Sequence, residues 1–190
     1  MANNKHDLII LFSGGADSAL MLEFAKMMGK NPYCILIDYE QLHKQELSKA
    51  RGYLDLRNIQ YQTVSIKNLN VNSGLTGNGK SSYDGVNEKH VPGRNTIFLS
   101  IALSIAESKQ IEKIWIGADY SDREHLFPDC YQEYYIKINE LFKITGSMPI
   151  TIEAPLLGMT KETVISILKG NGINVETIYS GYGEFEWEKE

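Results

Sequence analysis

A short segment near the N-terminus, residues 13–18 (Ser-Gly-Gly-Ala-Asp-Ser), carries the residue types best suited to binding phosphate. Its two glycines allow a tight turn that brings backbone N–H groups close to a ligand. The helix expected to follow would point its positive end at the same place, and the serine hydroxyls add donors. The segment therefore predicts an anion-binding loop suited to pyrophosphate. Its candidate binding residues are Ser13, Gly14, Gly15 and Ser18.

This loop differs from two familiar phosphate-binding motifs. No Gly-Lys-Ser/Thr follows it at the spacing of a Walker loop, and the dinucleotide fingerprint Gly-x-Gly-x-x-Gly is missing. A purely structural alternative is a glycine-rich turn in which Asp17 or Ser18 only caps the following helix. The full motif comes directly after an apolar strand, and this placement favours the binding function.

Alternating strands and helices would position the loop. Apolar runs predict strands at 8–12, 33–38, 61–66, 113–118 and 150–154. Periodic segments predict helices at 17–28, 45–58, 96–108, 131–144 and 161–168. This order predicts an α/β fold, a Rossmann-like parallel sheet of about five strands with helices on both faces. Ligands of such sheets bind beyond the carboxyl ends of the strands, where the strand order reverses.

The composition excludes several classes of protein. With 43% hydrophobic and 23% charged residues, the 190-residue chain is typical of folded globular proteins rather than disordered ones. A net charge of −5 without a basic stripe argues against direct nucleic-acid binding. Two cysteines, Cys34 and Cys130, are too few for a disulfide framework or a four-thiolate zinc site. This cysteine usage predicts a reducing compartment and hence a cytoplasmic protein. The short polar N-terminus and the lack of an apolar run of about 18 residues predict no signal peptide and no membrane contact.

The 13–18 segment resembles the pyrophosphatase loop of the N-type ATP pyrophosphatases, whose fold is that of the adenine nucleotide alpha hydrolases. The resemblance implies that ATP is cleaved to AMP and pyrophosphate while a substrate oxygen is adenylated. It also implies ATP and Mg²⁺ as cofactors. Asp17, beside the phosphates, would then help to hold the Mg²⁺.

Further segments narrow the resemblance. In order along the chain they are Asp38-Tyr39, Val91-Pro92-Gly93-Arg94-Asn95, Gly117-Ala118-Asp119, Pro128-Asp129-Cys130, Glu153-Ala154-Pro155-Leu156 and Thr160-Lys161. Together they are similar to the 7-cyano-7-deazaguanine synthase family over residues 8–168. The resemblance implies an AMP-forming carbon–nitrogen ligase in deazapurine biosynthesis, for queuosine or modified DNA. Such an enzyme joins 7-carboxy-7-deazaguanine and ammonia through an acyl-adenylate to give the 7-amide, and a second ATP then gives the 7-nitrile.

The matching positions supply the remaining candidate site residues, and several have a structural alternative. Arg94 suits a phosphate or a carboxylate, or it is a surface cation at a helix start that Asn95 caps. Asp129 reads the purine edge, or it caps the next helix. Lys161 contacts phosphate, or it is an ordinary first-turn lysine. The catalytic candidates are Asp17, Arg94 and Lys161; Asp38 and Gly117 join the nucleotide site; Arg94, Asn95, Asp119, Asp122 and Asp129 form the substrate site.

The sequence departs from the family pattern at several positions, and these departures change what we expect for the zinc site, the C-terminal tail and the product. Gly181 stands where the first of four zinc-binding cysteines would be, so we expect no structural zinc. We expect residues 1–170 to form the ATP pyrophosphatase domain and residues 171–190 a tail, held by packing of residues such as Ile178 or else mobile. Glu40, Leu42 and Asp119 replace the family's glycine, arginine and asparagine, so a variant that stops at the amide stays open. The family's habit also suggests a homodimer.

Two further readings of the whole chain stay open. One is another ATP pyrophosphatase, such as a tRNA-thiolating enzyme or the synthetase domain of an amidotransferase; the lack of paired cysteines and of a basic face argues against it. The other is a non-catalytic nucleotide-binding module. The intact 13–18 loop and Arg94 argue against decay, and the missing zinc cysteines argue mildly for it. The glycine-rich stretch 67–91 is a candidate lid.

Overall fold

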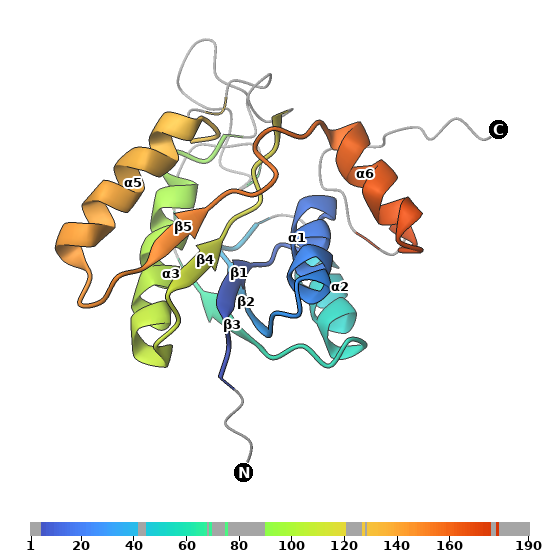
Figure 1. The fold of residues 1–190 in the computed structure, drawn as a ribbon, viewed down its shortest axis with the longest axis horizontal. Coiled ribbons are helices and arrows are strands. Elements are labelled where there is room, and N and C mark those ends of the chain that lie inside the picture. The colour runs from blue at the N-terminus through green and yellow to red at the C-terminus, as the bar shows by residue number, and fades with distance from the viewer. Residues whose placement is uncertain are drawn as a thin grey trace.

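A computed structural model describes residues 5–41, 45–67, 69, 75, 90–120, 127, 129–175 and 178. Within them a single sheet of five parallel strands has the order β3-β2-β1-β4-β5 (Figure 1). The strands are β1 (Leu8–Leu11), β2 (Pro32–Asp38), β3 (Tyr61–Ser65), β4 (Lys113–Trp115) and β5 (Thr151–Glu153). The predicted fold class is confirmed. Strand β4 is shorter than expected, so residues 116–119 belong to the loop that leaves it.

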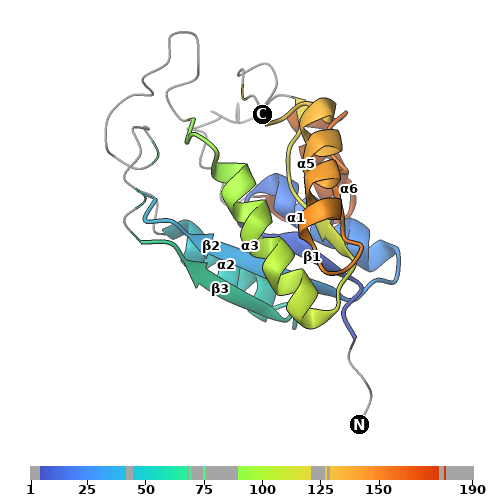
Figure 2. The same cartoon turned by 90° about the vertical axis from the view of Figure 1, so that its left-hand side faces the viewer.

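Helices cover both faces of the sheet (Figures 1 and 2). They are α1 (Ala16–Met27), α2 (Gln45–Asp55), α3 (Arg94–Lys109), α5 (Gln132–Thr145) and α6 (Lys161–Gly170). Side chains alternate between the two faces of each strand, so Ile9 and Ile35 pack in one core with α3 and α5. Leu8 and Leu36 pack in the other core with α1, α2 and α6.

The strand order reverses between β1 and β4, because β2 and β3 continue from β1 on one side and β5 continues from β4 on the other. The loops that follow β1 and β4 therefore start next to each other at the carboxyl edge of the sheet. Helix α3 returns the chain to the start of β4, so its N-terminus lies at the same edge. The sequence analysis predicted the ligand-binding residues at this edge.

Three helices start differently from the capping alternatives offered by the sequence. The residues at the N-cap are Gly15 for α1, Gly93 for α3 and Tyr131 for α5, and none makes a side-chain capping bond. The alternatives to their function were caps from Asp17 or Ser18, from Asn95, and from Asp129. Those capping roles are wrong, because the backbone turn at each start places a neighbouring residue at the N-cap position.

The C-terminal segment is described only in part. Ile178 is buried and packs in the core that contains Leu156, Val164 and Leu168. Gly181 and the rest of the tail from residue 179 on lie outside the described residues, so its packing stays a prediction there. None of the described helices is long and apolar enough to cross a membrane.

Candidate functional site

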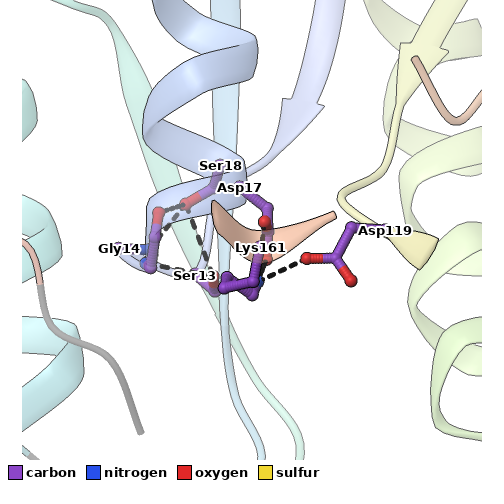
Figure 3. Close-up of polar contacts among 7 residues, drawn as sticks. Ser13, Gly14, Asp17, Ser18, Asp119 and Lys161 are labelled. Carbon is purple, nitrogen blue, oxygen red and sulfur yellow. Dashed lines mark hydrogen bonds and ion pairs between the residues drawn. The ribbon is translucent and has the colours of Figure 1, made fainter. Parts of the chain in front are cut away.

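Hydrogen bonds within residues 13–18 hold the loop that follows β1 (Figure 3). The Ser18 hydroxyl accepts from the Gly14 N–H at 3.0 Å and donates to the Gly15 carbonyl oxygen at 2.9 Å. The Ser13 hydroxyl accepts from the Gly15 N–H at 3.3 Å. The serines therefore shape the loop before any ligand arrives. The first N–H groups of α1 have no acceptor within a helix and point out of its N-terminus toward this loop.

Two glycines are required where chain segments approach closely. Gly14 has a φ of +87°, and a Cβ atom there would lie 2.8 Å from the Ala50 Cβ of α2. A Cβ atom on Gly117 would lie 3.1 Å from the Asp17 Cβ. The small residues thus let α2 pack against the 13–18 loop and let the loop after β4 reach Asp17.

A lysine and two aspartates from three separate elements form an ion cluster at this edge (Figure 3). The Lys161 Nζ, in the first turn of α6, lies 2.8 Å from Asp17 Oδ1 and 2.6 Å from Asp17 Oδ2. The same Nζ lies 2.7 Å from Asp119 Oδ2, in the loop after β4. The structure thus brings three candidate residues together, although Asp17 and Lys161 are 144 positions apart in the sequence.

Burial makes this ion cluster electrostatically strong. Asp119 is fully buried, whereas the side chains of Lys161 and Asp17 keep about a fifth of their surface exposed. Burial alone lowers the pKa of Lys161, but the carboxylates of Asp17 and Asp119 outweigh it and raise that pKa above its ordinary value. Lys161 therefore stays charged at neutral pH beside the two aspartates. The two carboxylates also explain how a cation is tolerated at a helix N-terminus, where the dipole disfavours it.

A second group of polar residues surrounds the start of α3. Asn95 is buried in the first turn beside Arg94, and the buried His90 ring lies 6.1 Å from the Phe127 ring. Burial lowers the pKa of His90; the Asp129 carboxylate opposes this effect, and the Arg94 guanidinium adds to it. The sequence candidates Arg94 and Asp129 are thus close enough to influence one imidazole.

His90 is a candidate that our sequence reasoning missed. It directly precedes the Val91–Asn95 segment, and this adjacency was the only available signal. The neighbouring contacts are polar as well. The Cys130 thiol lies 3.8 Å from Asp129 Oδ1, and the Tyr134 hydroxyl lies 2.9 Å from Thr96 Oγ1.

Asp38 shapes the turn that follows β2. Its Oδ1 accepts from the Glu40 N–H at 3.1 Å, and Glu40 has a φ of +61°. The Gln41 side chain accepts from the Tyr39 N–H at 3.1 Å in the same turn. A nucleotide contact from Asp38 stays a prediction beside this structural role.

Other predicted features lie outside the described part of the chain. They are Asp122, Leu42 and most of the candidate lid at 67–91. Among the described residues, no three His, Cys, Asp or Glu side chains gather as a metal site. The carboxylates of Asp17 and Asp119 are the oxygen donors that the ion cluster offers to a hard cation.

Comparisons with known proteins agree with the fold and with the family resemblance. The family described as "Queuosine biosynthesis protein QueC" matches residues 7–190. The 7-cyano-7-deazaguanine synthase of Rickettsia canadensis (strain McKiel) is 37% identical, over 92% of this chain and 84% of that protein. The protein of the same name from Saccharophagus degradans (strain 2-40) is 32% identical, over 96% of this chain and 84% of its own length.

Solved structures with low sequence identity share the fold alone. The U34-tRNA thiolase NcsA from Methanococcus maripaludis superposes with a TM-score of 0.57 at 14% identity, over 96% of this chain and 62% of the thiolase chain. A predicted tRNA methyltransferase subunit from Methanocaldococcus jannaschii gives a TM-score of 0.57 at 18% identity, over 93% of both chains. NMN synthetase from Francisella tularensis gives 0.55 at 16% identity, over 93% of this chain and 66% of the synthetase.

Proposed function

The chain belongs to the queuosine biosynthesis protein QueC family, and we propose that it is an ATP-dependent ligase acting on 7-carboxy-7-deazaguanine. It would join this substrate to ammonia to give 7-amido-7-deazaguanine and then dehydrate the amide to 7-cyano-7-deazaguanine. The observation that carries the proposal is the Lys161 ammonium, held between Asp17 and Asp119 beside the 13–18 loop. Groups suited to binding phosphate therefore lie together at the carboxyl edge of the sheet, where the strand order reverses, and this supports the proposal.

The first step answers a chemical difficulty, because a carboxylate is a poor electrophile. An oxygen of the substrate carboxylate attacks the α-phosphorus of ATP, the bond to the bridging oxygen breaks, and pyrophosphate leaves. The 13–18 loop, the N-terminus of α1 and Lys161 are placed to bind that pyrophosphate. Carboxylate oxygens fit Mg²⁺, which Asp17 would hold together with the phosphates and which would offset their negative charge.

The second step uses the leaving group made in the first. Ammonia attacks the activated acyl carbon, AMP departs, and loss of a proton leaves the amide. A second ATP then adenylates the amide oxygen, and departure of AMP with loss of the amide protons gives the nitrile. Arg94, Asn95 and Asp129 would hold the deazaguanine, because a carboxylate accepts hydrogen bonds from a guanine-type N–H edge.

A second outcome is favoured by one observation. Asp119 carries a charge where the family pattern has asparagine, and that charge is fully buried against Lys161. An added charge beside the reacting phosphates changes which intermediate the site stabilises. An enzyme that stops at 7-amido-7-deazaguanine is therefore the alternative product assignment.

We assign residues 1–170 to the ATP pyrophosphatase domain and residues 171–190 to a tail without structural zinc. The substrates are the small deazapurine and ammonia, supplied free or by a separate protein. We propose a cytoplasmic enzyme that needs no nucleic acid or membrane and pairs as a homodimer.

Mass spectrometry of the products tests the proposal. The purified chain is mixed with 7-carboxy-7-deazaguanine, ATP, Mg²⁺ and an ammonium salt. Nitrile would establish the two-step reaction, and amide that accumulates would establish the alternative. Failure to form AMP would overturn both and leave another ATP pyrophosphatase or a nucleotide-binding module.

Two variants report on the ion cluster in the same assay. Lys161→Met should lose AMP formation. Lys113→Met should keep it, because Lys113 starts β4 at the opposite edge of the sheet and pairs with Glu153 at 2.8 Å.

A further inference from the structure

We propose that His90 accepts the proton that the ammonia nitrogen loses when it replaces AMP on the activated substrate. This inference rests on the proposed function, because it concerns the same formation of a carbon–nitrogen bond. It adds a proton acceptor to a site whose other candidates bind phosphate, metal or the deazaguanine.

Two buried polar side chains near the start of α3 lack hydrogen-bond partners within the described part of the chain. His90 and Asn95 are each only 9% exposed. Neither side chain makes a hydrogen bond among the residues that the structure describes. Buried polar groups in folded proteins are nearly always hydrogen-bonded. The two side chains are therefore candidates for hydrogen bonds to a ligand rather than to the protein.

Packing rather than hydrogen bonding fixes the imidazole. The next residue, Val91, is buried in the core under α3, and its carbonyl oxygen accepts from the Arg94 N–H at 3.1 Å. The His90 ring lies 6.1 Å from the Phe127 ring, with 32° between the ring planes. Because α3 starts at the carboxyl edge of the sheet, these contacts hold the imidazole at the edge where a ligand binds.

Burial keeps the imidazole neutral at neutral pH. It lowers the pKa of His90 below the ordinary 6.5; the Asp129 carboxylate opposes this effect, and the Arg94 guanidinium adds to it. Among the described residues, these are the two charged side chains whose charges act on His90. A neutral imidazole has one nitrogen that can accept a proton. Histidine is the commonest general base, and its neutral form is the one that takes up the proton.

The reaction needs such an acceptor once the nitrogen has attacked. The new carbon–nitrogen bond uses the lone pair of ammonia, so the nitrogen becomes positively charged. The carbon–oxygen bond to AMP breaks, and its electron pair leaves with the phosphate oxygen of AMP. One N–H proton passes to the acceptor nitrogen of His90, which leaves the neutral amide. The Asp129 carboxylate stabilises the imidazolium until it gives the proton to water.

His90→Gln separates proton transfer from activation of the substrate. Glutamine keeps a hydrogen-bonding side chain but is not a base at neutral pH. ATP–pyrophosphate exchange with 7-carboxy-7-deazaguanine, measured without ammonia, should stay at the wild-type level. Amide formation with an ammonium salt, followed by mass spectrometry, should fall by at least about a hundredfold. His6→Gln is the matched control and should keep both rates, because His6 precedes β1 and pairs with Gln60 at 3.0 Å.

The pH dependence of the wild type tests the same idea without a substitution. Rates are compared at a fixed concentration of un-ionised ammonia. Amide formation should slow as the pH falls below 6.5, because a protonated imidazole cannot take the proton. ATP–pyrophosphate exchange should show no matching decline, and the remaining amide formation in His90→Gln should lack it too.

The contrary results are distinguishable from one another. Unchanged amide formation in His90→Gln, or no decline at acid pH in the wild type, would overturn the inference and leave the proposed function in place. Equal loss of exchange and of amide formation, in a variant that circular dichroism shows to be folded, would also overturn it, because His90 would then bind the substrate instead. No exchange in the wild type would overturn the proposed function itself.

Discussion

The two sides of the candidate site are organised differently. On the nucleotide side, Asp17, Asp119 and Lys161 come from three elements and meet within 2.8 Å, so their positions depend on the whole sheet. On the α3 side, His90 and Arg94 come from one stretch of chain, and the His90 ring lies 6.1 Å from the Phe127 ring. The first side is fixed by charge pairing across the fold, and the second by a helix start and by packing. Variants on the two sides should therefore fail in different ways.

The largest expected effect comes from Lys161→Met on the nucleotide side. It removes the ammonium that lies 2.7 Å from the buried Asp119 carboxylate and should lower the free energy of unfolding by about 3–5 kcal/mol. Chemical denaturation measures this change. Lys113→Met, whose pair with Glu153 is about 40% exposed on both side chains, should change it by less than about 1 kcal/mol.

A double variant separates folding from binding in that experiment. Adding Asp119→Asn to Lys161→Met removes the buried charge that the lysine had offset and should restore most of the lost stability, but not nucleotide binding. Equal destabilisation by the single and double variants would show that the ion cluster does not work as an interdependent unit.

Replacing one glycine on each side with alanine compares how tightly the two sides are packed. Gly14→Ala adds a methyl group 2.8 Å from Ala50 at a positive φ and should destabilise the fold by about 2–4 kcal/mol. Gly93→Ala, at the start of α3, has a similar φ of +67° but no atom within 4 Å of the added Cβ. It should cost only about 1–2 kcal/mol, the conformational term alone. Thermal denaturation of both variants tests the difference, and equal losses would mean that α2 yields to the added methyl group.

The contributions of the two sides to folding stability should also depend on different ranges of pH. Burial lowers the pKa of His90 below its ordinary 6.5, so the unfolded chain binds that proton more readily than the folded chain. Stability should then fall as pH drops below about 6.5, with a slope of at most one proton. Lys161 has a raised pKa, so its contribution is complete below its ordinary value of about 10.4 and is lost only as pH rises beyond it.

Replacing the imidazole isolates the acid-side effect. His90→Gln should remove that part of the slope between pH 6.5 and 5, as measured by urea denaturation at each pH. His6→Gln, in the exposed pair with Gln60, is the matched histidine control. An unchanged slope in His90→Gln would mean that other groups on the α3 side carry the acid response.

Local patterns in the sequence predicted the fold and the 13–18 loop because each depends on neighbouring residues. A run such as Leu8–Leu11 is buried on both faces and is read directly as a parallel strand. The capping roles failed because side-chain preferences at helix starts are weak compared with the turn that the backbone makes. Glycine occupies the N-cap of α1 and of α3 without any side-chain bond.

The ion cluster shows where sequence reasoning reached its limit. Asp17 and Lys161 were catalytic candidates and Asp119 was a substrate-binding one, because spacing along the chain does not reveal which loops meet at a sheet edge. The structure brings Asp119 against Lys161, whereas the sequence had grouped it with the substrate-binding residues. Its substrate contact stays a prediction. His90 was missed because a single histidine carries no spacing pattern.

The smallest expected effect concerns the turn after β2. Glu40 has a φ of +61°, a conformation that disfavours residues with a side chain by about 1–2 kcal/mol. Glycine would relieve that strain but would lose about 0.4–1 kcal/mol through the greater freedom of the unfolded chain. Glu40→Gly should therefore stabilise the fold by about 0.5–1 kcal/mol. Because glycine keeps the N–H that donates to Asp38, a loss of stability would show that the Glu40 side chain makes a contact worth more than the strain.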